Sequence, residues 1–209
     1  MATLTRAQRQ AQTRADLLEV AQQRFLADGY TGAGLDAIAE AAGYSKGAVY
    51  SNFTDKRTLC AAVLDEIHRQ KMTEIEAIVA GDAPVAERLE QINVWIENTV
   101  GDVSWTRLEM EFAAGVWRDP ELAAMEIELR GAVRQRVTAI LKIIAGEFGV
   151  TDDRLAVTQM SLDDMAELIL SAGIGLGIQR AVDPSISVAP AIDAVRLVVG
   201  VLTLAGAAG

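Results

Sequence analysis

Apolar residues recur at helical spacing along most of the chain. The first stretch of this pattern contains Leu17, Leu18, Ala21 and Phe25. It stops at Gly29, a residue type that readily adopts the left-handed conformation that closes a helix. The same spacing predicts helices over residues 9–28, 35–42, 56–80, 85–100, 104–117, 120–146, 161–181 and 190–205, with another that begins at Ser45. Because no segment alternates as a strand does, the pattern predicts an all-α protein.

The helix predicted over residues 56–80 separates two regions. Three shorter helices precede it, and the remaining helices follow it. At a rise of 1.5 Å per residue it would be about 36 Å long. We therefore expect it to connect a small N-terminal region to a larger helical region.

Composition limits the chemistry that this chain can perform. One Cys and one His are too few for a disulfide or a structural zinc site. We expect Cys60, which lies in an apolar helical pattern, to be a buried and inert thiol, and His68 to lie on the solvated surface. The longest apolar runs, 168–178 and 197–209, are shorter than the roughly 18 residues of a membrane helix. These features predict a soluble, cytoplasmic protein with no metal, cofactor or membrane partner.

The segment from Ile38 to Tyr50 has the spacing of a helix-turn-helix. Such a motif needs a small residue where its helices cross, a glycine in the turn four residues later, and an apolar anchor six residues after that. Ala39, Gly43 and Val49 meet these three requirements. An ordinary helical hairpin is the alternative. Such a hairpin can show one of these three features by chance, whereas all three together are specific to a helix-turn-helix.

A longer stretch around this motif resembles the tetracycline-repressor (TetR) family of transcriptional regulators. The matching positions are Phe25, Gly29, Tyr30, Ile38, Ala39 and residues 42–59. The resemblance implies a basic arm over residues 1–9, a DNA-binding domain over 10–70 with its helix-turn-helix at 34–53, and a helical ligand-binding and dimerisation domain over 71–209. The family usually has Thr or Ser where the second helix opens. This chain has Ala33-Gly34, so we expect no side-chain contact with DNA there.

The resemblance also implies that the helix beginning at Ser45 enters the major groove of an operator. Recognition helices place their N-terminal residues at the base edges. Lys46 can reach guanine or a phosphate, Ala48 offers a methyl group to thymine, and Tyr50 offers a hydroxyl to a phosphate. The expected DNA-contacting residues are Ser45, Lys46, Gly47, Ala48, Tyr50, Ser51, Asn52 and Lys56. We expect Phe53 to lie in the core.

Aromatic residues crowd the helices in the middle of the chain. They fit either plain core or an effector pocket lined by apolar side chains with a few polar groups. Glu109, one turn from Trp105, is either the acceptor for a cationic ligand or a solvated acid. The candidate pocket consists of Trp95, Trp105, Leu108, Glu109, Phe112 and Met125.

The helix predicted over residues 161–181 is unusually rich in glycine. Each glycine weakens a helix by about 1 kcal/mol relative to alanine, so a close helix–helix approach or a bend must account for them. In TetR-like proteins the last two helices of each subunit form a four-helix dimer interface. The expected interface residues are Leu168, Ile169, Gly173, Leu176, Val195, Val198, Val199 and Leu202.

These expectations define a dimeric regulator, most simply a repressor. It would bind a palindromic double-stranded operator and be released by a small, largely apolar effector. A ligand-blind or architectural DNA-binding protein of the same fold is the alternative. An all-helical enzyme built around Glu109, Glu111 and His68 is a remote one, because no nucleophile–base pair or phosphate-binding loop accompanies these residues.

The net charge of −10 first argues against a polyphosphate partner. Its distribution changes that conclusion. Residues 1–60 contain seven Lys and Arg against six Asp and Glu, so residues 61–209 carry the acidity, at −11. Arg6, Arg9 and Arg14 precede the first acidic residue of the chain. We therefore expect modest non-specific affinity for DNA, with binding dependent on a few well-placed contacts.

Overall fold

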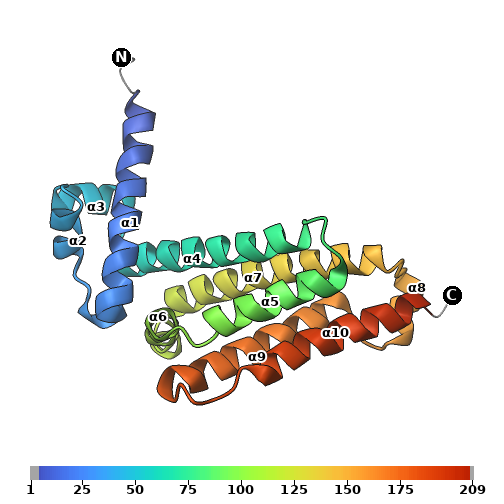
Figure 1. Ribbon diagram of the computed structural model, residues 1–209. Coiled ribbons are helices and arrows are strands. Elements are labelled where there is room, and N and C mark those ends of the chain that lie inside the picture. The colour runs from blue at the N-terminus through green and yellow to red at the C-terminus, as the bar shows by residue number, and fades with distance from the viewer. Residues whose placement is uncertain (1–4, 208–209) are drawn as a thin grey trace. The chain divides into compact units, whose positions relative to one another are not determined.

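The computed structural model describes residues 5–207, which form helices joined by short turns and contain no strand (Figure 1). This confirms the all-α prediction. The helices are α1 (Arg6–Gly32), α2 (Leu35–Ala41), α3 (Lys46–Asn52), α4 (Lys56–Val79), α5 (Val85–Thr99), α6 (Val103–Ala113), the 3-10 helix η1 (Val116–Arg118), α7 (Pro120–Glu147), α8 (Asp152–Val157), α9 (Leu162–Val182) and α10 (Ala189–Ala207).

Three differences separate these helices from the predicted ones. Helix α8 was not predicted, because six residues are too few to show a helical period. Helix α6 ends early, since the chain turns at Gly115, where a Cβ atom would overlap the side chain of Leu122. Helix α1 begins at Arg6, three residues before the predicted start at residue 9, so Arg6 and Arg9 both lie in its first turns. The first four residues of the predicted arm lie outside the described residues.

Side chains cap the helix starts that the sequence indicated. The Ser45 hydroxyl accepts a hydrogen bond from the amide of Ala48 and so caps α3, the helix that was predicted to begin at Ser45. At the start of α4, Asp55 accepts from the amide of Thr58 at 2.9 Å, and the Thr58 hydroxyl accepts from the amide of Asp55 at 3.1 Å. The start of α2 at Gly34 has no side-chain cap, as its missing hydroxyl predicted.

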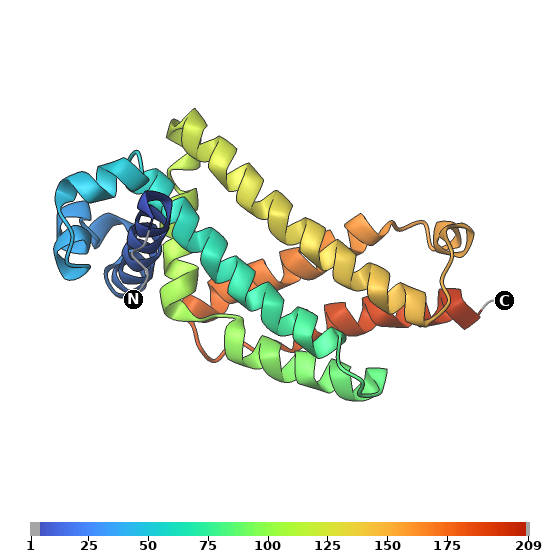
Figure 2. The same cartoon turned by 90° about the horizontal axis from the view of Figure 1, so that it is seen from above.

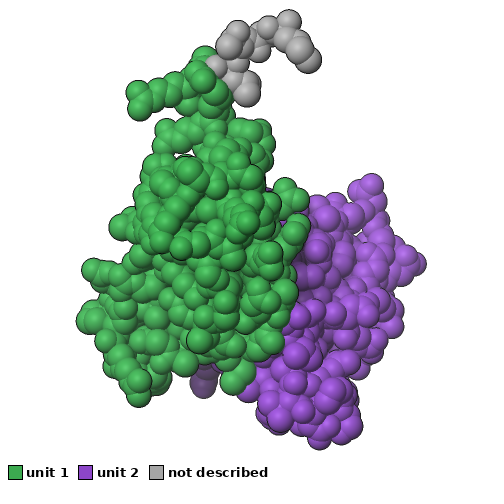
Figure 3. Space-filling view, turned by 90° about the vertical axis from the view of Figure 1, so that its left-hand side faces the viewer, with its two compact units in different colours: residues 1–67, 107–129 green, residues 68–106, 130–209 purple. Residues whose placement is uncertain are grey.

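The chain divides into two compact units (Figure 3). Unit 1 contains residues 1–67 and 107–129, and unit 2 contains residues 68–106 and 130–209. The first unit therefore includes segment 107–129, which the sequence assigned to the C-terminal domain. This segment carries most of α6, all of η1 and the start of α7.

The core of unit 1 forms around the first three helices. Helices α2 and α3 pack against each other and against α1, and both lie on the same side of α1 in Figure 1. The predicted apolar residues Leu17, Phe25, Ile38 and Val49 are fully buried there. Phe53 is also buried, as expected. Burial of each such side chain contributes roughly 1.5–3 kcal/mol, which is how these short helices hold together.

The core of unit 2 is formed by one face each of several long helices. Helix α10 packs against α9, α8 and α5. Helix α8 lies beside the C-terminal end of α10 in both views (Figures 1 and 2), where Arg154 donates a hydrogen bond to the carbonyl oxygen of Gly206 at 2.9 Å. Ile192, Val198 and Leu202 place the inner face of α10 in this core.

Helices α9 and α10 are long and apolar enough to cross a membrane, by length and composition alone. Their 18-residue windows have mean hydropathies of 1.3 and 1.6, although only 17% and 39% of those windows is buried. Core helices of soluble proteins pass the same test, so the expected absence of a membrane partner stays a prediction. A partly covered apolar helix pair is also what a protein–protein interface requires.

The first prediction concerns Gly29, where α1 bends. Its φ of 76° is strained for any residue with a side chain, and a Cβ atom would lie 2.7 Å from Oε1 of Glu111. We expect Gly29→Ala to lower the free energy of unfolding by about 1–3 kcal/mol, measured by urea denaturation. Gly131→Ala is the matched control: nothing lies within 4 Å of its Cβ position inside α7, so it should stabilise the helix by up to about 1 kcal/mol. Equal effects of the two substitutions would contradict this explanation.

Candidate nucleic-acid interface

A tight turn joins α2 to α3. Gly43 has a φ of 74°, and no atom lies within 4 Å of the Cβ position, so the turn needs glycine for its backbone conformation and not for space. The amide of Tyr44 donates to the carbonyl oxygen of Ala39 at 2.9 Å. With Ala39 and Val49 both buried, the three residues singled out in the motif perform the structural roles predicted for them.

Helix α3 presents the predicted contact residues unequally. Lys46, Gly47 and Ser51 are exposed, and the side chain of Tyr50 lies 48% in solvent. Three polar side chains are engaged by the helix itself. The Ser45 hydroxyl forms the N-cap. The Ser51 hydroxyl and the side-chain amide of Asn52 both donate to the carbonyl oxygen of Ala48, at 2.9 and 2.8 Å.

Lys56 faces its own unit. Its ammonium group donates to the carbonyl oxygen of Thr31 at 3.2 Å and lies 5.0 Å from the centroid of the Tyr30 ring. Burial lowers the pKa of Lys56, as expected for a cation partly withdrawn from water. A phosphate contact would require the Lys56 ammonium group to exchange the carbonyl oxygen of Thr31 for DNA, and this contact stays a prediction.

Lys46 forms an ion pair with Asp36, the second residue of α2. Its ammonium nitrogen lies 2.9 Å from each carboxylate oxygen, and both side chains are mostly exposed. The hydrogen bond to Asp36 raises the pKa of Lys46. The one cation of α3 is therefore paired at the surface that is expected to meet DNA.

Two residues of α1 that the motif did not indicate support α3 and its turn. The guanidinium of Arg14 donates to the carbonyl oxygen of Asn52 at 2.9 Å, and its Cζ atom lies 4.2 Å from the centroid of the Phe53 ring. The hydroxyl of Tyr44 donates to Asp16 at 2.7 Å, which lowers the pKa of Asp16. These contacts join residues 38 and 28 positions apart, so no local sequence pattern could reveal them.

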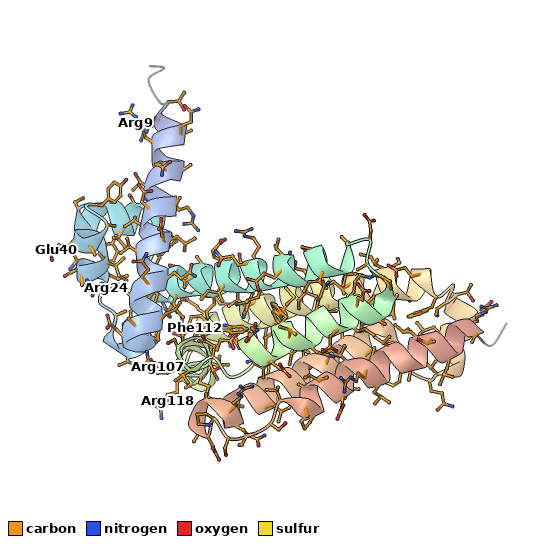
Figure 4. The ribbon with its side chains drawn as sticks, viewed as in Figure 1. Arg9, Arg24, Glu40, Arg107, Phe112 and Arg118 are labelled. Atoms are coloured by element: carbon orange, nitrogen blue, oxygen red, sulfur yellow. The ribbon has the colours of Figure 1, made fainter. Side chains whose placement is uncertain are left out.

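Two side chains of α6 bind the backbone of α1, one before the bend at Gly29 and one after it. Arg107 donates to the carbonyl oxygens of Leu26 at 3.0 Å and Ala27 at 2.9 Å. Glu111 accepts from the amide of Thr31 at 3.0 Å. The bend at Gly29 leaves carbonyl groups before it and amides after it without helical partners. The Arg107 guanidinium binds these carbonyl groups, and the Glu111 carboxylate binds an amide just after the bend. Figure 4 shows Arg107 and Phe112 near this end of α1.

A second polar cluster joins the start of α4 to the start of α7. Arg57 forms ion pairs with Asp55 at 2.6 Å, with Asp119, and with Glu121 at 3.2 Å. The hydrogen bond from Arg57 lowers the pKa of Asp119. Arg57 therefore acts as a structural cation within unit 1.

The residues of the predicted effector pocket divide between the two units. Trp95 and Trp105 belong to unit 2, and Leu108, Glu109, Phe112 and Met125 belong to unit 1. Leu108 and Phe112 are fully buried in unit 1, and the Phe112 ring lies 5.9 Å from the ring of Tyr30. The indole nitrogen of Trp95 donates to Glu74 at 2.7 Å. The pocket itself stays a prediction.

Two further expectations concern residues of α4. Cys60 is buried as expected, and burial raises its pKa to about 12, which leaves the thiol protonated and unreactive. His68 was expected on the surface. It is instead half-buried, with its ring 6.0 Å from that of Trp105.

The structure corrects half of the predicted dimer interface. Val195, Val198, Val199 and Leu202 are buried in the core of unit 2, with Leu202 at 0% exposure, so these side chains have no surface to offer a partner. Leu168 is exposed, and Ile169, Gly173 and Leu176 are half-buried. The large apolar residues of α10 that are exposed are instead Leu197 and Leu204, which the helical pattern alone could not distinguish from the inner ones.

Residues 17–63 match the model of the family described as "Bacterial regulatory proteins, tetR family". A stretch of 57 residues is 41% identical to the HTH-type transcriptional regulator TtgR of Pseudomonas putida. That match spans 27% of this chain and only 27% of the length of TtgR.

Solved structures resemble nearly the whole chain. A protein of Mesorhizobium loti assigned to the TetR family is 20% identical, with 96% of this chain and 98% of that chain covered and a TM-score of 0.67. GusR of Salmonella enterica is also 20% identical, with 96% and 99% covered and a TM-score of 0.64. At such identities the likeness shows the fold.

The second prediction tests the support of α3 by α1. Arg14→Ala removes a charged hydrogen bond and a cation–π contact, so we expect the free energy of unfolding to fall by about 1 kcal/mol. Arg9→Ala, an exposed arginine on the same helix, should change it by less than about 0.5 kcal/mol. Urea denaturation monitored by circular dichroism measures both, and similar losses would refute a supporting role for Arg14.

Proposed function

We propose that this chain, which belongs to the TetR family of regulators through its N-terminal domain, represses transcription by binding operator DNA through α3. The observation that carries the proposal is the exposed N-terminal end of α3. Lys46 and Gly47 lie there, and the exposed Tyr50 lies one turn further along α3, on a helix-turn-helix whose packing residues are buried. Recognition helices use this end to read base edges. Ala48 and Ser51 extend the same surface. The ammonium group of Lys56 instead binds the carbonyl oxygen of Thr31 within unit 1.

We further propose that two copies bind a palindromic operator. Leu197 is 60% exposed and Leu204 is 73% exposed, and they lie seven residues apart on one face of α10. Together with Leu168 on α9 they leave apolar surface that a second copy would cover. Two copies of α3 about 34 Å apart would occupy successive major grooves.

A small effector is the third part of the proposal. The indole nitrogen of Trp105 is buried and has no hydrogen-bond partner among the described residues. A buried N–H group without a partner favours a ligand with an acceptor atom, within an otherwise apolar molecule. Effector and operator would then weaken each other's binding by the same factor. A regulator of transcription acts where the DNA is, which is the cytoplasm of a bacterium.

The third prediction tests the DNA-binding surface. An operator is first obtained by selecting sites from a random duplex library with the full-length protein. We expect Tyr50→Phe, which removes one exposed hydroxyl, to weaken binding to that site about fivefold. The matched control is Tyr44→Phe, whose lost hydroxyl binds Asp16 inside unit 1, and it should change affinity by less than about twofold. Fluorescence anisotropy measures both, and equal affinities of Tyr50→Phe and the wild type would remove Tyr50 from the contact surface.

The fourth prediction tests the dimer. Leu197→Glu combined with Leu204→Glu would place two carboxylates in an apolar interface, so we expect a dimeric wild type and a monomeric variant in sedimentation-velocity experiments. Ile127→Glu is the control, because Ile127 is 72% exposed on α7 in unit 1, and it should stay dimeric. A dimeric double variant would place the interface elsewhere.

A further inference from the structure

The helix-turn-helix of this chain carries an unusual charge distribution. Over residues 35–52 it has one cation, Lys46, and two carboxylates, Asp36 and Glu40. A motif that meets DNA only through phosphates would instead be expected to be basic. The acidic residues of α2 therefore need an explanation that involves more than attraction to the DNA backbone.

The two carboxylates differ in their surroundings. Asp36 places both oxygen atoms 2.9 Å from the ammonium nitrogen of Lys46, with 68% of its side chain and 59% of the Lys46 side chain exposed. Glu40 is exposed on the same helix, one turn further on, and lies on its outer side in Figure 4. Such exposed ion pairs contribute little to folding, so stability alone does not explain why Asp36 and Lys46 are paired.

The Asp36–Lys46 pair places a hydrogen-bond donor next to an acceptor. An ammonium group has three N–H donors and a carboxylate about four acceptor sites, so each group keeps bonding capacity beyond the other. Lys46 is the first residue of α3, the end of a recognition helix that faces base edges. Because Asp36 is bonded to it, its carboxylate lies within reach of the same base pair.

We propose that Asp36 is a specificity-determining residue that reads a G·C base pair together with Lys46. In the major groove, guanine offers its O6 and N7 acceptors to the ammonium group, and the N4 amino group of cytosine donates to the carboxylate. An A·T pair places the O4 acceptor of thymine where cytosine has its donor, so the carboxylate would face another acceptor. This inference rests on the proposed function and adds the identity of a base.

The pair also reduces binding to other DNA. A phosphate offers only acceptors, so it satisfies Lys46 but leaves Asp36 as a nearby repulsive charge. A G·C pair satisfies both groups at once. The Asp36 carboxylate therefore weakens binding to non-operator DNA, where Lys46 contacts only a phosphate, more than it weakens binding to the operator.

The experiment compares Asp36→Asn with Glu40→Gln, which makes the same change of charge on the same helix. Sites are first selected from a random duplex library with the full-length protein. The wild type and each variant are then titrated with three kinds of duplex: the selected one, a set in which one G·C pair at a time is exchanged for A·T, and a scrambled one. Titrations are repeated across a range of salt concentrations.

For the wild type and Glu40→Gln we expect the exchange at one symmetric position to weaken binding at least fivefold, in line with the discrimination of about 1–3 kcal/mol per base contact. An amide both donates and accepts, so Asp36→Asn should reduce this preference to less than about twofold. It should also bind the scrambled duplex more tightly, with a slope of log K against log [salt] steeper by about 0.9, equivalent to one additional phosphate contact.

A purely structural ion pair would affect all duplexes alike and leave the base preference unchanged. Asp36→Ser serves as a second variant should Asp36→Asn fail to fold, and circular dichroism establishes folding of each. Two outcomes would overturn this inference and leave the proposed function intact. In one, folded Asp36 variants retain the preference for G·C. In the other, no position of the selected site shows a preference for G·C in the wild type. A wild-type protein that binds selected and scrambled duplexes equally would overturn the proposed function as well.

Discussion

The bend of α1 at Gly29 is the constraint on which unit 1 depends. The chain bends there because Gly29 has a positive φ and a non-helical ψ, which leaves carbonyl groups before the bend and amides after it without helical partners. Arg107 and Glu111, one turn apart on α6, supply the missing donor and acceptor. Segment 107–129 therefore belongs to the same compact unit as the helix-turn-helix, although Thr31 and Glu111, which bond to each other, lie 80 residues apart in sequence. A rotation or shift of α6 would have to break charged hydrogen bonds at the end of α1.

Helix α6 contributes residues to both compact units. Helix α6 begins in unit 2 at Val103 and continues in unit 1 from Arg107. Helix α1 in turn holds α3 through Arg14 and the turn of the motif through Asp16. Under the proposed function, an effector that changed α6 would therefore act on Arg107 and Glu111, the side chains that bind α1. Coupling of this kind requires two arrangements of packed elements that the two ligands favour differently.

The cations near the candidate interface are mostly committed within the protein. Lys56 binds a carbonyl group, Arg57 binds three carboxylates, and Lys46 is paired with Asp36. The number of Lys and Arg residues near α3 therefore overstates the positive charge available to DNA. Under the proposed function, binding would rely on geometry, on the symmetry of the proposed dimer and on the exchange of internal partners for those on DNA, which is a basis for discrimination between sequences.

The sequence by itself determined the helical architecture, the helix-turn-helix and its turn at Gly43, because these depend on local periodicity, capping groups and glycine conformation. It also placed Val49 and Phe53 in the core correctly. Only the tertiary structure decided which apolar residues of α10 face inward, because Leu197 and Leu202 are equally apolar and differ only in what packs against them. The same holds for Lys46, Lys56 and Arg14, whose partners lie far away in sequence or on another helix. Local patterns reflect the short-range energy of the chain, whereas the partner of a long charged side chain is set by which surfaces the fold brings together.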